Sequence, residues 1–173
     1  MFLGHDIEMD DSVGLTTLLD GFSQTQKRFK DACKGTDKDA AFLALFEVLN
    51  WAASIDDYMR RNWRPEGKPL GLEWSSRFDT ECDGVVRGAR FARNRVHHQW
   101  ARALQYKPGG LQFPVEAPFV FHEWCWLPVE SLPPSDRNQD FGIEQYDSHL
   151  SGRPIRFTLS VLKRVYGTAQ ENS

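Results

Sequence analysis

The chain has 173 residues, of which 40% are hydrophobic, 13% are aromatic and 26% are charged, and its formal net charge is −3. This length fits a single domain, and the balanced composition excludes a wholly disordered chain and a collagen-like repeat. A chain so close to neutrality is not a general polyanion binder, because such binding depends on many cations that neutralise phosphates. Any contact with nucleic acid must therefore come from a local cluster of positive charge.

Cysteine content and hydropathy indicate the cellular compartment that we expect for this protein. Cys33, Cys82 and Cys125 are an odd number of thiols without a CxxC motif, so the sequence predicts neither a disulfide framework nor a zinc site. The sequence shows no basic-then-apolar leader and no stretch of about 20 apolar residues. We therefore expect a protein of the reducing cytoplasm that makes no contact with a membrane.

Apolar residues at helical spacing predict two helices at the start of the chain. The first helix begins at Asp11 or Ser12 and ends near Lys34, before a glycine. The second helix covers residues 36–62, and Thr36-Asp37-Lys38-Asp39 resembles a capping box that opens it. Asp56-Asp57-Tyr58, near the end of this helix, could line a cleft, but a solvated helix end is the favoured interpretation.

The next elements are a loop and a third helix. Residues 64–73 hold two prolines and two glycines, which is typical of a loop. Ser76 or Asp79 can start the third helix, which is expected to last until Lys107, before Pro108-Gly109-Gly110. This helix carries residues 87–100, which are rich in arginine and histidine.

The last part of the chain is expected to be an insertion followed by a helix. Residues 108–140 are rich in proline, and the aromatic and β-branched stretch at residues 119–127 favours a short strand pair or an ordered insertion. Pro154 suits the first turn of a final helix that Gly167 closes. The sequence as a whole predicts a mainly α fold, an antiparallel bundle of about four helices with this β-like insertion before the last.

The third helix separates polar residues from apolar ones when successive residues are placed about 100° apart. Its polar side carries Asp83, Arg87, Arg90, Arg93, Asn94, His97 and His98. Its opposite side carries Val85, Ala92, Val96 and Ala103, with Ala89 and Trp100 beside them. Small apolar residues allow another helix to approach closely, so we expect this second side to pack. The polar side supplies the local positive charge that the whole chain lacks.

A solvated helix face is the common explanation of such a pattern, but the order of the residues argues for a function. Arginine followed directly by asparagine, with histidine at one fixed spacing, is expected about 0.01 times by chance in a chain of this composition. The segment Arg93-Asn94-Arg95-Val96-His97-His98 contains this arrangement. It resembles the Arg-Asn-x-x-x-His motif of HEPN domains, the higher eukaryote and prokaryote nucleotide-binding superfamily.

HEPN domains are helical bundles, and many are metal-independent endoribonucleases of toxin–antitoxin, phage-defence and RNA-processing systems. The resemblance implies one such domain over residues 1–173, without cofactor or metal, that acts on RNA as a homodimer. A cognate inhibitor protein is a further candidate partner. The resemblance also implies that Arg93 and His98 are the catalytic pair and that Asn94 supports them.

These residue types suit RNA cleavage by attack of the 2′-hydroxyl. Imidazole transfers protons near neutral pH, and guanidinium stabilises the charge that develops on the phosphate. Because Arg93 and His98 lie about 140° apart on one helix, a symmetric dimer is expected to bring them together. His97 shares a helix face with Arg93 and is the second candidate for proton transfer. The residues expected to bind substrate are Arg87, Arg90 and Arg95.

Two alternatives to an enzyme stay open. The first is a non-catalytic HEPN-like bundle that binds a protein, a nucleotide or RNA through the same polar face. The second is a structural or antitoxin-like dimer, in which the arginines pair with acidic residues of the partner subunit.

Overall fold

The computed structural model describes residues 13–62, 73–99, 103–109, 121–134 and 141–171, and the expectation of a mainly α chain is confirmed. Within these residues the α-helices are α1 (Leu15–Ala32), α2 (Lys38–Asn62), α3 (Thr80–Gln99), α4 (Ile143–His149) and α5 (Ile155–Glu171). Two strands, β1 (Leu104–Gly109) and β2 (Phe121–Trp126), and two 3₁₀ turns, η1 (Trp74–Arg77) and η2 (Val129–Ser131), complete the described elements.

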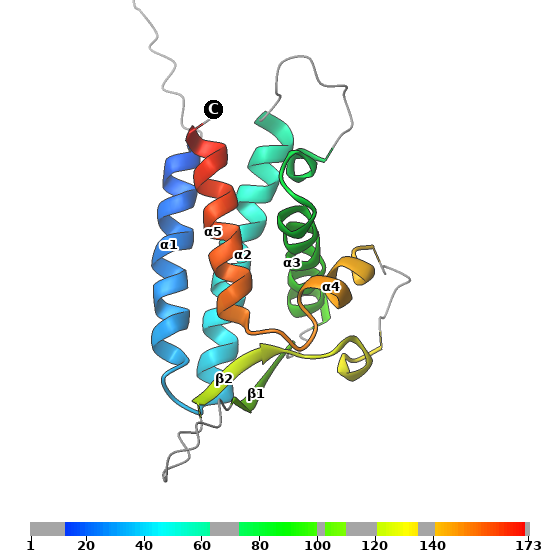
Figure 1. Cartoon of the computed structure of the whole chain (residues 1–173). Coiled ribbons are helices and arrows are strands. Elements are labelled where there is room, and N and C mark those ends of the chain that lie inside the picture. Colours follow the sequence, from blue (N-terminus) through cyan, green and yellow to red (C-terminus); the bar gives the residue numbers. More distant parts are fainter. Residues whose placement is uncertain (1–12, 63–72, 100–102, 110–120, 135–140, 172–173) are drawn as a thin grey trace, which may run out of the picture.

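The long helices lie side by side (Figure 1). In Figure 1, α1 and α3 run in one direction and α2 and α5 run in the opposite direction, with the β hairpin across one end. The core lies between these helices and is built from apolar residues at helical spacing. It includes Phe22 of α1, Leu45, Leu49 and Ile55 of α2, Val85 and Ala92 of α3, and Leu159 and Leu162 of α5. Burial of each large side chain contributes about 1.5–3 kcal/mol to folding.

Aspartates begin two of the helices. The Asp37 carboxylate accepts hydrogen bonds from the backbone N–H groups of Asp39 and Ala40, so the cap of α2 is Asp37 and not Thr36. The Asp79 carboxylate accepts a hydrogen bond from the backbone N–H of Cys82 at 2.8 Å, and α3 follows it directly. Of the two starts predicted for the third helix, Asp79 is therefore the one observed.

The predicted end of the third helix is wrong. The helix α3 ends at Gln99, and residues 104–107 belong to β1, which pairs with β2 in an antiparallel hairpin. Leu104 pairs with Trp126, and the ring centroid of Tyr106 lies 4.9 Å from that of Trp124. Pairing with a strand later in the chain thus decides the conformation of this segment. The strand expected within residues 119–127 is confirmed as β2.

The helix α4 was not predicted, and its seven residues are too short to show a helical period. It packs closely on α3, where Gly84 and Gly88 present no side chain. A Cβ at Gly84 would lie 2.2 Å from the ring of His149, and one at Gly88 would lie 2.7 Å from Leu150. Gly142 begins α4 with a φ of 91°, which favours glycine.

The final helix is longer than predicted. The helix α5 continues to Glu171, so Gly167 does not close it. The start agrees with the prediction, because Pro154 precedes Ile155 directly. The indole N–H of Trp126 donates to Thr158 Oγ1 at 2.8 Å and joins the hairpin to this helix.

The predicted loop at residues 64–73 lies, except for Glu73, outside the described residues, as do residues 110–120 and 135–140 of the predicted insertion. Among the helices that the structure describes, none is both long and apolar enough to cross a membrane.

Candidate functional site

The polar side of α3 faces α2 along a seam, and three levels of contact follow one another along it. Arg90 contacts Asp56, Arg93 borders a small cavity with Leu49, and His97 contacts Phe46. Because the two helices run in opposite directions, residue numbers rise along α3 as they fall along α2. The opposite side of α3 is packed as expected, since Val85, Ala89, Ala92 and Val96 are all buried.

The first level is a buried ion-pair network around Arg90. Its Nε and Nη2 donate to the two carboxylate oxygens of Asp56, each at 2.8 Å. Its Nη1 and Nη2 also donate to the carboxylate of Glu73, at 3.3 and 3.1 Å. The indole N–H of Trp74 donates to Asp56 Oδ1 at 2.7 Å. The side chains of Arg90 and Asp56 are only 15% and 9% exposed, so this network is a structural element of the seam.

Burial and pairing act in opposite directions on the groups of this network. Burial alone lowers the pKa of Arg90, but hydrogen bonds and attraction from Asp56 and Glu73 outweigh it and raise that pKa. Burial raises the pKa of Glu73, but its hydrogen bonds with Arg90 and the nearby charges of Arg60 and Arg87 outweigh it and lower that pKa. The arginine and this carboxylate are therefore held in their charged forms.

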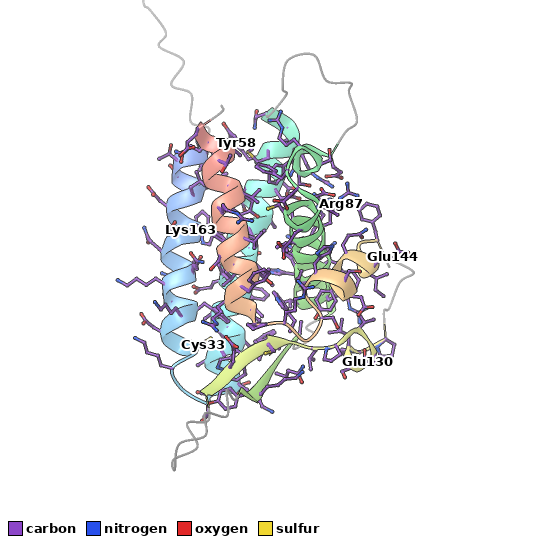
Figure 2. All side chains as sticks on the ribbon, viewed as in Figure 1. Cys33, Tyr58, Arg87, Glu130, Glu144 and Lys163 are labelled. Carbon is purple, nitrogen blue, oxygen red and sulfur yellow. The ribbon has the colours of Figure 1, made fainter. Side chains whose placement is uncertain are left out.

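Two more arginines beside this network are also paired with carboxylates. Arg87 lies on α3 (Figure 2) and contacts Asp83, one turn earlier on the same helix, at 3.0 Å. The hydroxyl of Ser75 donates to the same carboxylate at 2.6 Å. Arg60 contacts Glu73 at 3.1 Å and Asp56 at 3.7 Å. The positive charge predicted for this part of α3 is thus largely neutralised within the chain.

The second level is Arg93, which differs from these arginines. Within the part of the chain that the structure describes, Arg93 forms no ion pair, and its buried Nε has no hydrogen-bond partner. Its Nη1 donates to Asn94 Oδ1 at 3.3 Å, a contact between neighbouring residues of the motif. Arg93 also lines a cavity of about 20 Å³, room for about one water molecule, between α2, α3 and α5. The cavity is lined by Leu49, Ala52, Ala53, Asp56, Val86, Ala89, Arg90, Arg93 and Tyr166.

Tyr166 closes this cavity from the side of α5. Its hydroxyl donates to the backbone carbonyl of Ala52 at 3.3 Å. Burial raises the pKa of Tyr166 well above its usual value, and the charge of Asp56 adds to the effect. Tyr166 therefore stays a neutral hydrogen-bond donor near the seam.

The third level is aromatic. The ring of His97 stacks on that of Phe46, with 3.9 Å between centroids and 20° between planes. Phe42, one turn earlier on α2, lies 6.4 Å from Phe46. His97 is half-buried by these contacts. His98 belongs to α3, but its side chain lies outside the described residues.

Arg95, predicted to bind substrate, lies apart from the seam. It is 6% exposed, its Nη2 donates to the backbone carbonyl of Pro133, and its guanidinium lies 5.8 Å from the ring centroid of Phe91. These contacts join α3 to the segment after η2. Of the predicted site residues, the structure brings Arg87, Arg90, Arg93, Asn94 and His97 to the seam and places Arg95 elsewhere.

Glu73 is a member of this site that sequence reasoning missed, and Asp56 is one that it considered but did not favour. Asp56 was expected to be a solvated charge, and it is instead a buried partner of Arg90. Its place on the apolar face of α2, one residue after the buried Ile55, was the available signal. No cluster of three or more metal-ligating side chains occurs within the described ranges.

Comparison of the chain with protein-family models, with curated proteins and with solved structures found no match.

Proposed function

We propose that this chain is a HEPN-like endoribonuclease that cleaves RNA by attack of its 2′-hydroxyl, without a metal ion. We regard α1, α2, α3 and α5 as the antiparallel bundle of such a domain, with the hairpin and α4 as the insertion. By the same resemblance, it acts in the cytoplasm as a toxin or phage-defence effector with a cognate inhibitor. The observation that carries the proposal is Arg93, an arginine without a carboxylate partner in the described residues, at the first position of the motif.

The proposed roles follow from the chemistry of each group. Arg93 keeps its charge and offers planar donors to the phosphate oxygens, where negative charge develops in the transition state. Asn94 accepts a hydrogen bond from Arg93 at 3.3 Å and so orients its guanidinium. His98 transfers a proton, either from the 2′-hydroxyl or to the leaving 5′-oxygen. His97 is the second candidate for this transfer, and its stacking on Phe46 supports an orienting role instead.

Fewer arginines are proposed to bind the substrate than the sequence predicted. Arg87 is 28% exposed and its carboxylate partner lies on the same helix, so it is retained as a phosphate contact. Arg90 and Arg95 donate to groups of the chain itself, and the proposal does not depend on their binding RNA.

We further propose a homodimer in which each subunit completes the site of the other. Residues 93 and 98 are separated by five positions of a continuous helix, which corresponds to about 140° around its axis. A second copy related by a twofold axis can present its histidine to this arginine across one cleft.

The decisive experiment is incubation of the purified protein with a mixed RNA pool in the presence of EDTA. We expect cleavage in EDTA that is lost on RNA carrying 2′-deoxyribose at the scissile position, since the nucleophile is then missing. Arg93→Ala and His98→Ala should each lower the rate about 100-fold or more. Lys163→Ala on α5 (Figure 2) removes one positive charge from an exposed position and should leave the rate unchanged.

Comparison of His97→Ala with His98→Ala assigns the proton transfer. If the folded wild-type protein never cleaves RNA in these assays, the proposed endoribonuclease activity is refuted. Equal loss in the Lys163→Ala control would show that net charge alone, and not the motif, determines the rate.

The non-catalytic alternative is favoured by one observation, the neutralisation of Arg87 and Arg90 by carboxylates of the same chain. This arrangement leaves less free positive charge for RNA than the sequence predicted. Binding of RNA without any cleavage, abolished by Arg93→Ala, would support that alternative.

A further inference from the structure

Most of the charged side chains along the α2–α3 seam are paired with one another. Three carboxylates, those of Asp56, Glu73 and Asp83, contact three arginines. Those arginines are Arg60, Arg87 and Arg90. Arg93 is a fourth arginine beside this set, and none of the three carboxylates pairs with it.

The distribution of these pairs explains why Arg93 has no carboxylate partner among the described residues. Asp56 and Arg93 line the same small cavity. Both oxygens of Asp56 already accept hydrogen bonds from Arg90 at 2.8 Å, and Oδ1 accepts another from Trp74. Burial of a carboxylate that is 9% exposed is energetically unfavourable without such partners. If Arg90 were absent, the cations left near Asp56 would be Arg60, at 3.7 Å, and Arg93, and of these two Arg93 is the one that borders the cavity.

We propose that Arg90 is a positioning residue: by saturating Asp56 it prevents that carboxylate from capturing Arg93. Asp56 is then a latent competitor of the RNA phosphate for the Arg93 guanidinium, since carboxylate and phosphate accept the same planar pair of donors. The ion-pair exchange stands on the geometry alone, whereas its consequence for RNA rests on the proposed function.

A double-mutant cycle tests the exchange without any RNA. Asp56→Asn and Arg93→Met are made singly and together, in the wild-type chain and in the Arg90→Met background, and unfolding is followed in urea. With Arg90 present, the two substitutions should be additive within about twofold in the unfolding equilibrium constant. In the Arg90→Met background, the Asp56–Arg93 pair forms, and the two substitutions should deviate from additivity by about tenfold.

The proposal is overturned if the deviation from additivity is the same in the wild-type and Arg90→Met backgrounds, or if neither background shows one. Where Arg90→Met does not fold, Arg90→Lys replaces it, because lysine keeps the charge but cannot bind both oxygens of Asp56 in a planar pair. We expect a deviation of at least about threefold in that background, and its absence also overturns the proposal.

A binding experiment tests the consequence for RNA. The probe is a 2′-O-methyl RNA oligonucleotide, which lacks the free nucleophile, and its affinity is measured over a range of salt concentrations. Loss of one phosphate contact lowers the slope of log affinity against log salt by about 0.7 for a single strand. We expect this loss in Arg93→Met and in Arg90→Met, and recovery when Asp56→Asn is added to Arg90→Met. Lys163→Met is the charge-matched control and should keep the wild-type slope.

The recovery is the readout that a purely structural role of Arg90 would not produce, because Asp56→Asn removes the competitor without restoring the lost ion pairs. Failure of this inference differs from failure of the proposed function. RNA cleavage by the wild type with no background-dependent coupling refutes the exchange alone. Coupling that depends on Arg90, in a protein that neither binds nor cleaves RNA, refutes the function and leaves the exchange in place.

Discussion

The two halves of the polar face of α3 have similar residue types and opposite environments. In the first half, Arg87 and Arg90 are held by carboxylates from α3 itself, from α2 and from the segment before α3. In the second half, Arg93 has no carboxylate partner in the described residues, and His97 lies against a phenylalanine. The neighbours on α2 make the difference, because its end carries Asp56 and its earlier turns carry Leu49 and Phe46. The charge available to a ligand therefore depends on the facing helix as much as on the helix that bears the motif.

Loss of Arg90 should have the largest effect on stability. It would also remove the difference between the two halves of the polar face of α3. Arg90→Met leaves Asp56 and Glu73 with fewer partners, and we expect a loss of about 3 kcal/mol in the free energy of unfolding. Urea denaturation followed by circular dichroism measures it. Arg60→Met is the matched control, because Arg60 is 41% exposed and should cost less than about 1 kcal/mol. Equal losses in both variants would show that the network does not act as a buried ion pair.

Loss of the contact between His97 and Phe46 should have a smaller effect on stability. It tests the environment of the second half of the polar face of α3. Aromatic pairs contribute about 0.5–1.5 kcal/mol beyond the area that they bury, as double-mutant cycles measure. For His97→Leu and Phe46→Leu we expect a coupling near the lower end of that range, because both rings are only half-buried. Phe42→Leu, combined with His97→Leu, serves as the control and should show less coupling. A coupling of zero for the first pair would make the stacking incidental.

The smallest expected effect is the pH dependence that Glu73 contributes to stability. In the folded chain, burial raises the pKa of Glu73, but Arg90 and its neighbouring arginines lower it below the usual 4.5. Such a carboxylate stabilises the fold above its unfolded pKa, and the contribution disappears as the pH falls through the folded pKa. Glu73→Gln should therefore be less stable than wild type at pH 7, and the difference should shrink below about pH 4.5.

Denaturant midpoints measured from pH 7 to pH 3 test this prediction. Glu47→Gln is the control, because the exposed pair of Glu47 with Arg28 should contribute little at any pH. A difference between wild type and Glu73→Gln that stays constant over this range would show that the charge of Glu73 is not coupled to folding.

Much of the helical framework follows from the sequence. The apolar periods of α1, α2 and α5 are long, and long periods are read reliably because many residues contribute to one face. The division of α3 into a polar side and a packed side is also determined by residue order. The location of the motif on this polar side was therefore predictable.

The hairpin and α4 depended on contacts between distant residues. Residues 104–107 fit a helix or a strand, and pairing of Leu104 with Trp126 decided for the strand. The seven residues of α4 are held against α3, where Gly84 and Gly88 leave space for His149 and Leu150.

For the candidate site, the sequence by itself determined which residues share the polar side of α3, because helical geometry alone sets their angular positions. Only the tertiary structure decided which of their charges are free. Arg90 meets a carboxylate 34 residues earlier in the chain and another 17 residues earlier, whereas Arg93, one turn later, meets neither. The physical reason is that electrostatic pairing acts over a few ångströms in space, and the crossing of α2 and α3 sets those distances.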